Sequence, residues 1–341
     1  MVTVPDKIHT TARKIYEWYE SKREGHRSHL GASLIGHHCD RYLWLTFRWA
    51  KTPEFEGRVL RLFDTGKREE GRVYAELRAV GVELHTEEEP GKQIECRDET
   101  GHFGGSVDGI GRGFSESPKT WAVLEIKTMN DKAFSQLRMK GVEAEKPMHY
   151  AQMQTYMGLL SLERAAYMAV NKNTDDIHTE WIHFNPGAFQ KFMIRAGLVI
   201  MAGKPPMKAS QDPANWQCKM CDMHSLCHAG ETAETNCHTC CHASIGKAGS
   251  WFCELHKNDI TLETQRTGCG DHLYIPDLVP SATAIDGGEN RIDYVDNATG
   301  EEFSNGPGKL PSRSLRGRKR VIAASAPPST AFPFDDEIPF R

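Results

Sequence analysis

The sequence of 341 residues has no apolar run long enough to cross a membrane, and its first residues lack the apolar centre of a signal peptide. It also lacks a strong charge of either sign. With 42 Lys and Arg against 46 Asp and Glu, any surface that binds nucleic acid must be local. A hydrophobic content of 39% and a charged content of 26% are typical of globular proteins. We therefore expect a protein that stays in the cytoplasm, with one large domain or two smaller ones.

Ten cysteines stand out against this ordinary composition, and eight of them lie between Cys218 and Cys269. Disulfides are rare in a reducing cytoplasm, and several of these cysteines are separated by only two to five residues. Such short spacings are typical of metal ligands. The sequence therefore predicts bound metal rather than disulfides.

The segment 103–128 has the pattern of a β-hairpin, because two short alternating runs flank a polar turn. On the second strand Glu125 and Lys127 share one face, whereas Ile126 belongs to the opposite, apolar face. Asp108 lies near the end of the first strand, where pairing brings it beside Glu125. Two carboxylates and an ammonium at the edge of a core are costly unless something compensates them. The pattern therefore indicates a Mg²⁺ or Mn²⁺ site, and the alternative is a solvated face with a chance ion pair.

Two predicted helices carry further polar residues toward the core. The segment 57–84 has helical periodicity, and Glu70 interrupts its apolar stripe while Glu69 points about 100° away. Glu70 is therefore either a boundary residue or a ligand. The segment 147–162 also reads as a helix. Three of its residues form one stripe: His149, Gln152 and Tyr156.

The remaining periodic segments complete a mixed α/β core of roughly 200 residues, a size that one domain can carry. Residues 6–24 predict an amphipathic helix with Ile15 and Trp18 turned inward. Two further strands are expected over AAYMAVNK and HTEWIHF. A closing helix is expected over PGAFQKFMIRAGLVIMAGKPP, with a proline near its start.

Four of these features occur in an order that resembles a known family. They are Gly66-x3-Glu70, Val107-Asp108, Glu125-Ile126-Lys127 and Gln152-x3-Tyr156. Together they resemble the ordered motifs of the PD-(D/E)XK nuclease superfamily, within the branch of the RecB nuclease domain and lambda exonuclease. The resemblance covers about residues 30 to 230. Val107 replaces the proline that gives the family its name, and Glu70 stands where RecB-like members carry a histidine, as in the lambda exonuclease version.

The resemblance implies a restriction-endonuclease-like core, a central mixed β-sheet flanked by helices, and a metal-dependent DNA exonuclease. It implies that the metal ligands are Glu70, Asp108, Glu125 and the carbonyl of Ile126, and that Lys127 orients the attacking water. Gln152 and Tyr156 would position Lys127 and the phosphate backbone. An endonuclease or flap nuclease on the same core, or a non-catalytic DNA-binding scaffold, remains the alternative. Such enzymes serve phage or bacterial recombination, replication and repair, so a phage-encoded chain would act in the host cytoplasm.

Three clustered cysteines, Cys218-x2-Cys221-x5-Cys227, need a fourth ligand to hold a metal centre. An iron–sulfur subgroup of the same nuclease branch has one cysteine before its core and three after it with this spacing. Cys39 occupies the place of the first. The resemblance therefore implies a [4Fe–4S] cluster that joins the two ends of the domain, and zinc at the same four residues is the alternative.

A second set follows as Cys237-x2-Cys240-x12-Cys253-x2-His256, with Cys269 further on. The paired spacing is typical of a small zinc-binding module. Cys237, Cys240 and Cys253 are the expected ligands, and the spacing leaves the fourth open between His256 and Cys269. Two cysteines are not expected to be ligands: Cys96 and Cys241.

The end of the chain carries three weaker signals. Residues 288–309 favour a short β-hairpin, and a basic linker follows. The hexapeptide Asp335–Phe340 resembles the acidic tip of bacterial single-stranded-DNA-binding proteins, although Arg341 follows it here. We expect this tail either to recruit replication or recombination proteins or to act as an acidic solubilising end. The predicted partition is a nuclease domain, a zinc module, a hairpin segment and a linker with a disordered tail: 1–230, 231–280, 281–310 and 311–341.

Overall fold

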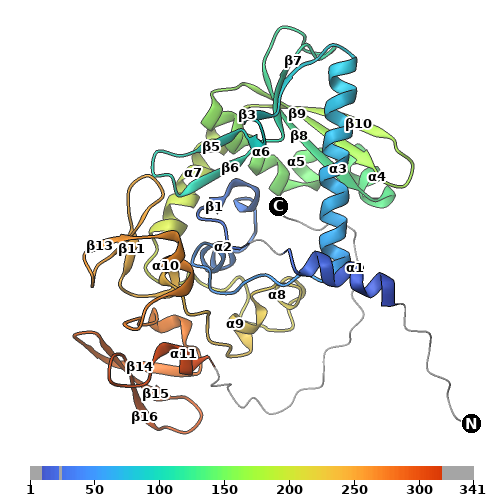
Figure 1. Cartoon of the computed structure of the whole chain (residues 1–341). Coiled ribbons are helices and arrows are strands. Elements are labelled where there is room, and N and C mark those ends of the chain that lie inside the picture. Colours follow the sequence, from blue (N-terminus) through green and yellow to red (C-terminus); the bar gives the residue numbers. More distant parts are fainter. Residues whose placement is uncertain (1–9, 23–24, 317–341) are drawn as a thin grey trace, which may run out of the picture.

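The computed structural model describes residues 10–22 and 25–316 and has a mixed α/β fold (Figure 1). Its largest sheet has five strands in the order β10-β9-β8-β7-β2. The interior strand β9 is buried along nearly its whole length, as expected of an apolar strand covered on both faces. The strand bounds are β2 Glu83–His85, β7 Gly109–Arg112, β8 Ala122–Met129, β9 Arg164–Asn171 and β10 Ile177–His183.

The parallel pair β8 and β9 is joined by a helical crossover, and the other neighbours in this sheet are antiparallel. The crossover consists of three helices, as a parallel connection requires. A hydrogen bond from the backbone of Ala133 to the side chain of Asn130 begins the first of them. The crossover helices are α4 Asp131–Lys140, α5 Val142–Glu145 and α6 Pro147–Leu160.

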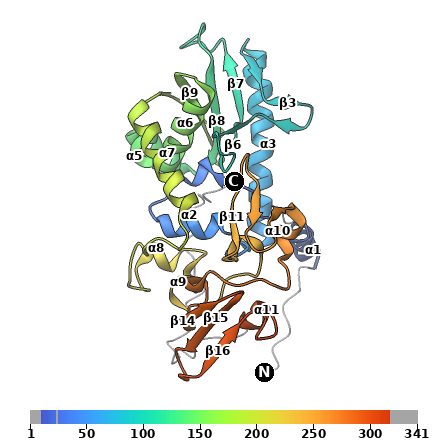
Figure 2. The same cartoon turned by 90° about the vertical axis from the view of Figure 1, so that its left-hand side faces the viewer.

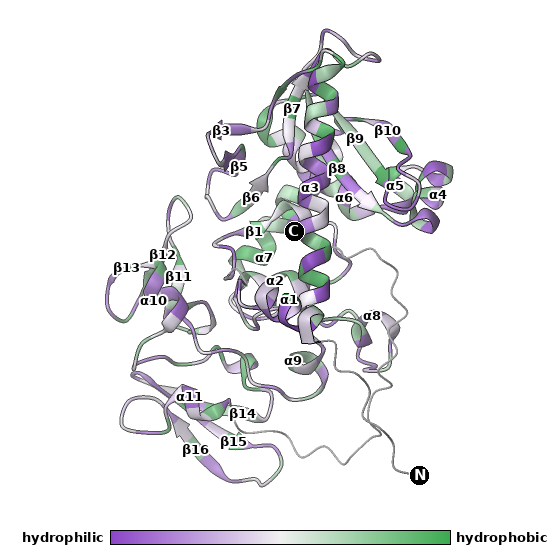
Figure 3. Ribbon diagram, turned by 45° about the vertical axis from the view of Figure 1, so that its right-hand side comes forward, coloured by the Kyte–Doolittle hydropathy of each residue, from purple (hydrophilic) through white to green (hydrophobic). Residues whose placement is uncertain are grey.

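Two helices cover opposite faces of the sheet (Figure 2). The long helix α3, Gly57–Ala79, packs Val73 and Leu77 against the face of β8 that carries Leu124 and Ile126. Helix α6 covers the other face, which is the face of Val123 and Glu125 on β8. Polar and apolar residues alternate around α3, as expected of a helix with one face on a sheet (Figure 3).

The predicted hairpin is confirmed, but its first strand is broken in two. Only β7 pairs with β8, whereas β6, Phe103–Ser106, joins a second sheet with β1, Leu30–Gly31, and β5, Glu95–Arg97. The chain changes sheet between Val107, whose N–H still bonds to the β5 side, and the start of β7. Asp108 therefore lies at a corner between two sheets rather than along a strand.

The other predicted elements of the core are confirmed, and helix α7 spans Pro186–Met201. The predicted orientation of the first helix is wrong. Helix α1, Thr10–Glu20, leaves Ile15 and Trp18 exposed at 45% and 51%. It lies at the edge of the molecule and packs against one end of α3, where a side-chain oxygen of Glu20 accepts the backbone N–H of Gly57 at 2.7 Å.

The C-terminal part adds two small antiparallel sheets. The predicted hairpin over 288–309 is formed by the antiparallel strands β15 and β16. The hydrophobic core continues into this part. His238 is buried and lies between Trp49 at 3.6 Å and Trp251 at 3.9 Å, measured between ring centroids. The sheets consist of β11 Ala243–Ile245, β12 Trp251–Cys253, β13 Asn258–Ile260, β14 Ala282–Gly288, β15 Arg291–Asp296 and β16 Glu302–Asn305.

Short elements connect these parts, and no described helix is long and apolar enough to cross a membrane. The predicted tail and most of the basic linker lie outside the described residues. The predicted domain limits stay predictions. The remaining elements are η1 Ala32–Leu34, α2 Asp40–Phe47, β3 Glu87–Glu89, β4 Lys92–Gln93, α8 Trp216–Lys219, α9 His224–His228, η2 Cys237–Thr239, α10 Leu262–Thr267, η3 Pro276–Leu278 and α11 Ser312–Leu315.

Candidate functional site

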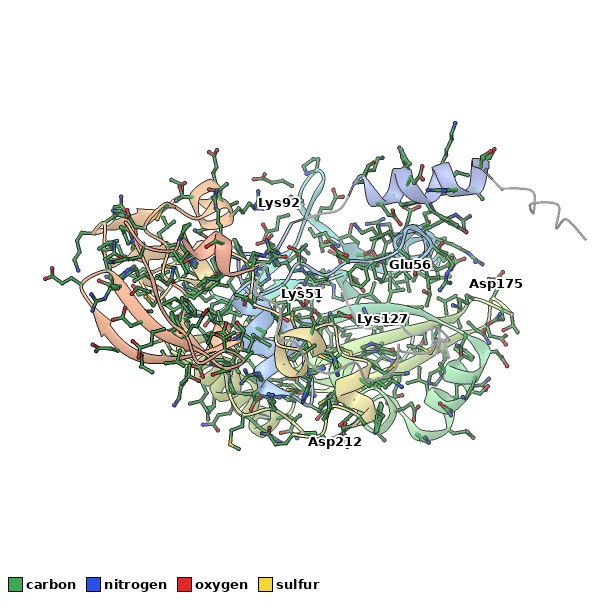
Figure 4. All side chains as sticks on the ribbon, turned by 90° about the horizontal axis from the view of Figure 1, so that it is seen from below. Lys51, Glu56, Lys92, Lys127, Asp175 and Asp212 are labelled. Carbon is green, nitrogen blue, oxygen red and sulfur yellow. The ribbon has the colours of Figure 1, made fainter. Side chains whose placement is uncertain are left out.

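The acidic and basic residues predicted from the hairpin converge at the corner between the two sheets. The carboxylate of Asp108 accepts the backbone N–H of Ile126 at 2.7 Å, which holds it against β8. On β8, Lys127 forms an ion pair with Glu125 on the face toward α6. Figure 4 shows Lys127 near the middle of the view, whereas Lys92 and Asp212 lie toward its outline. The three side chains therefore share one site, as predicted.

Helix α6 supplies the next layer of contacts. The side-chain N–H of Gln152 donates to Glu125 at 3.2 Å, and the same amide nitrogen lies 3.3 Å from the hydroxyl of Tyr156. Tyr156 reaches this position over Gly105, because a Cβ atom there would lie only 2.6 Å from the hydroxyl. Gln152 and Tyr156 of the predicted stripe thus hold Glu125 from α6.

Glu70 approaches from α3 and is half-buried. Burial, with the nearby charge of Asp108, raises its pKa to about 7. Burial likewise raises the pKa of Glu125 to about 8, although Lys127 opposes the rise, and it raises the pKa of Asp108. Burial disfavours the charged form of Lys127, but the three carboxylates outweigh it and raise the pKa of the amine.

One lysine does not balance three carboxylates, and this imbalance favours a bound divalent cation. Hard oxygen donors are the ligands that Mg²⁺ and Mn²⁺ prefer. The side chains of Glu70, Asp108 and Glu125 fit such an ion by their chemistry and by their shared burial. Burial is the main cause of the raised pKa values of Glu70 and Glu125, and the neighbouring carboxylates add to it, because each is more costly to charge beside the others.

The sequence reasoning missed Tyr74, which follows Glu70 by one helical turn on α3. Burial raises its pKa, and the charges of Asp108, Glu70 and Glu125 raise it further, so its phenol lies at the same site. The signal was present, because residues four apart on a helix share a face.

The first predicted set of cysteines comes together at one cavity. Its lining includes all four thiols: Cys39, Cys218, Cys221 and Cys227. Burial raises the pKa of Cys227, and the Arg41 guanidinium against this thiol partly offsets the rise. Arg41 also donates to the carbonyl of Pro206 at 3.0 Å, which ties the first cysteine's helix to the segment that leads to the other three. The set therefore fits a metal centre that needs four thiolates.

The second set is also assembled. Burial raises the pKa of Cys237 to about 12, and so do the nearby thiols of Cys240, Cys269 and Cys253. In contrast, the neighbouring Cys241 thiol and nearby backbone groups lower the pKa of Cys240 to about 6, which favours its thiolate. The thiols of Cys240, Cys269 and Cys253 are thus all near enough to Cys237 to act on its pKa.

Asp271, which the sequence reasoning missed, lies beside this set. Among the described residues, one group of three has all its ligand atoms within 4.8 Å of one another: His256, Cys269 and Asp271. The ring of His256 is 3.9 Å from the Cys269 sulfur and 3.4 Å from a carboxylate oxygen of Asp271. Ligands around one tetrahedral zinc ion are separated by about 3.3–3.7 Å, so this group also approaches a metal-binding geometry.

Comparisons with known proteins place the chain far from all of them. No protein-family model and no curated protein matches it. The alkaline exonuclease LHK-Exo from Laribacter hongkongensis is 15% identical, with a TM-score of 0.38 over 54% of this chain and 90% of that chain. LHK-Exo in complex with dAMP gives 15% and 0.38 over 55% and 90%. The crystal structure of SSO0001 gives 15% and 0.39 over 64% and 96%. The function is therefore argued from the residues of this chain.

Proposed function

We propose that the chain is a metal-dependent DNA nuclease that hydrolyses phosphodiester bonds from DNA ends. The observation that carries this proposal is the convergence of Asp108, Glu125 and Lys127 at one corner, with a third carboxylate facing them from α3. A structural ion pair would need one acid and one base. Three acids around one amine instead suit a site that binds a cation together with a phosphate.

Each side chain has a definite part in this chemistry. A bound Mg²⁺ or Mn²⁺ would polarise the phosphodiester and stabilise charge on its oxygens, held by Glu70, Asp108, Glu125 and the carbonyl of Ile126. Lys127 holds the attacking water and offers its ammonium to the phosphorane charge. Gln152 keeps Glu125 in place through its amide N–H. Tyr156 in turn holds Gln152 through the contact between its hydroxyl and the Gln152 amide nitrogen.

The test is digestion of end-labelled linear DNA, single- and double-stranded, with Mg²⁺ or Mn²⁺. We expect products of graded length from linear DNA and none from a closed circle. Lys127→Ala should abolish cleavage of both single- and double-stranded linear DNA without unfolding the protein. Lys92→Ala, at an exposed ion pair with Glu88, is the matched control. Cleavage of closed circles would show an endonuclease instead. Full activity of Lys127→Ala would refute the assignment of the site.

We propose a [4Fe–4S] cluster at the cavity of the first cysteine set, with zinc as the alternative. The support is that all four thiols line one cavity. A cluster would join the start of α2 to the α8–α9 segment, which carries the other three cysteines. Anaerobically purified protein with a cluster is brown and contains about four irons per chain, whereas Cys39→Ser should be colourless. Stoichiometric zinc without iron would establish the alternative.

We propose that a zinc ion is held by Cys237, Cys240, Cys253 and Cys269. The support is that Cys237 is buried with the three other thiols near enough to raise its pKa further, while His256 lies toward the exposed rim with Asp271. Metal analysis should find one zinc fewer in Cys269→Ser and an unchanged content in His256→Ala. Loss of the zinc in both variants would instead favour the group of His256, Cys269 and Asp271.

The remaining proposals concern organisation and partners. DNA ends are the proposed substrate, and the limits 1–230, 231–280, 281–310 and 311–341 are the proposed divisions of the chain. We also propose that the tail Asp335–Phe340 recruits replication or recombination proteins, since an acidic, apolar terminus suits basic pockets on such enzymes. Deleting residues 332–341 should release those partners in a pull-down, and unchanged partner capture would reject this.

A further inference from the structure

One residue of the α6 stripe has no part in the nuclease chemistry described above. His149 precedes Gln152 by one helical turn and therefore faces the same sheet surface. Its Nδ1 atom lies 2.8 Å from the hydroxyl of Tyr167. Tyr167 on β9 is directly beside Glu125 on β8 in the parallel register, so both side chains project from the same face. His149 thus stands next to the catalytic residues.

The direction of this hydrogen bond follows from burial. Tyr167 is fully buried, and among the described residues His149 is the partner found for its hydroxyl. If Nδ1–H were the donor, the tyrosine proton would be buried without an acceptor, which costs about 1–3 kcal/mol. The hydroxyl therefore donates and Nδ1 accepts. A neutral imidazole then carries its proton on the other nitrogen, Nε2.

The surroundings keep the ring neutral and leave Nε2 available. Burial lowers the pKa of His149 well below its usual range, and the ammonium groups of Lys127 and Lys146 lower it further. His149 is only half-buried, and within the described part of the chain Nε2 is neither bonded to a protein group nor sealed from solvent. A fixed N–H therefore faces solution beside two cationic side chains.

We propose that His149 is a phosphate-binding residue: its Nε2–H donates to a non-bridging oxygen of the DNA backbone at the Glu125–Lys127 site. This rests on the proposed nuclease function. The chemistry suits a phosphate because a neutral imidazole N–H can donate to a phosphate oxygen, and a cation held by the three carboxylates would offset their negative charge. An imidazolium at the same place would be repelled by the ammonium groups of Lys127 and Lys146. Tyr167 acts through His149 by fixing the tautomer, so it is a positioning residue.

Two substitutions separate this role from a structural one. His149→Asn places an amide near Nδ1, where it can still accept from Tyr167, but it removes the donor at Nε2. His149→Gln places its amide near Nε2 and gives up the bond to Tyr167. We expect the Asn variant to raise KM for a linear duplex about tenfold to a hundredfold, as loss of a hydrogen bond to a charged group does. The KM of the Gln variant should stay within about threefold of the wild-type value, even if this variant melts at a lower temperature.

The control is His183→Asn, at an exposed histidine on the edge strand β10, which should change neither KM nor the melting temperature. A titration with inorganic phosphate and Mg²⁺ gives a second measurement without DNA cleavage. Wild type and His149→Gln should bind phosphate more tightly than His149→Asn.

The outcomes distinguish this inference from the nuclease proposal. If wild type cleaves DNA and the Asn and Gln variants have equal KM and equal phosphate affinity, His149 is structural and the inference is overturned. If wild type cleaves no DNA but the phosphate affinities still differ in the expected order, the phosphate site stands and the nuclease proposal fails. Equal phosphate affinities in an inactive protein would reject both.

Discussion

The substitution Glu70→Gln tests the candidate site, because it should raise the melting temperature of the metal-free protein and weaken the response of that temperature to metal. Burial and Asp108 raise the pKa of Glu70 from 4.5 to about 7. A raised carboxyl pKa means that the folded state holds a proton which the unfolded state releases. The resulting stability is therefore present below pH 4.5 and is lost as pH rises toward 7. Above pH 7 the metal-free protein bears the full cost of the charge, and a glutamine removes it.

The magnitude follows from the same pKa values. Each pKa unit corresponds to about 1.4 kcal/mol, so the rise from 4.5 to about 7 sets an upper bound of about 3 kcal/mol at pH 8. Asp108 shares the repulsion, and we expect a gain of about 1–3 kcal/mol. A protein of this size gains ~2–4 °C in melting temperature per kcal/mol. In EDTA, Glu70→Gln should therefore melt several degrees above wild type at pH 8 and at the same temperature near pH 4.5.

Added metal should narrow this difference. A bound cation stabilises the fold in proportion to the logarithm of its affinity, and a tenfold weaker site loses about 1.4 kcal/mol of that stabilisation. Glu70→Gln should accordingly show a smaller rise in melting temperature with Mn²⁺ than wild type. The matched control is Glu69→Gln, because Glu69 turns away from the site and pairs with Arg72 on the surface. It should be slightly destabilised with or without metal and should keep the full response to Mn²⁺.

Scanning calorimetry or dye-based melting of the three proteins, at both pH values and with or without Mn²⁺, decides the matter. The reasoning is refuted if Glu70→Gln melts below wild type at pH 8 in EDTA and responds to Mn²⁺ as wild type does. Glu70 would then be an ordinary boundary residue of α3.

Three further predictions follow from the same contacts. Metal-supported cleavage should increase from pH 6 to pH 8 in a rate profile, because the pKa values of Glu70 and Glu125 are raised to about 7 and about 8; a flat profile would contradict this. Gly105→Ala should lower the cleavage rate at least tenfold, since its Cβ would lie 2.6 Å from the Tyr156 hydroxyl, and unchanged kinetics would show that this contact is adaptable. Gly249→Ala should lower the melting temperature by several degrees, because its φ is 76° and a Cβ would meet the backbone of the β5–β6 turn at 2.9 Å. Gly300→Ala, with a φ of 74° and open space, should lower it only through backbone strain. Equal losses of melting temperature in the two variants would contradict a tight contact between Gly249 and the β5–β6 turn.

Most of the core was predictable because its signals are local. Helical and strand periodicity identified α3, α6, β8, β9 and α7, since each of them buries one face and the apolar positions repeat with its geometry. The alternation along β8 also placed Glu125 and Lys127 on one face. The order of the motifs and the cysteine spacings named the candidate ligands before any contact was known.

The orientation of α1 shows what local periodicity cannot decide. Its apolar residues repeat as in a buried helix, yet Trp18 is 51% exposed although α1 packs against the first turns of α3. Periodicity states which residues share a face. The presence of a partner for that face depends on how distant segments pack.

The sequence by itself determined which side chains are candidates for the chemistry, because residue type and spacing along a strand or helix are local properties. Only the tertiary structure decided how they meet. The change of sheet turns Asp108 toward β8, and Glu70 and Tyr74 approach the same site from α3. The hydrogen bond from Tyr167 fixes the tautomer of His149. These relations join residues far apart in the chain. Their pKa values and hydrogen-bond directions arise from burial and mutual charge, which exist only once the chain has folded.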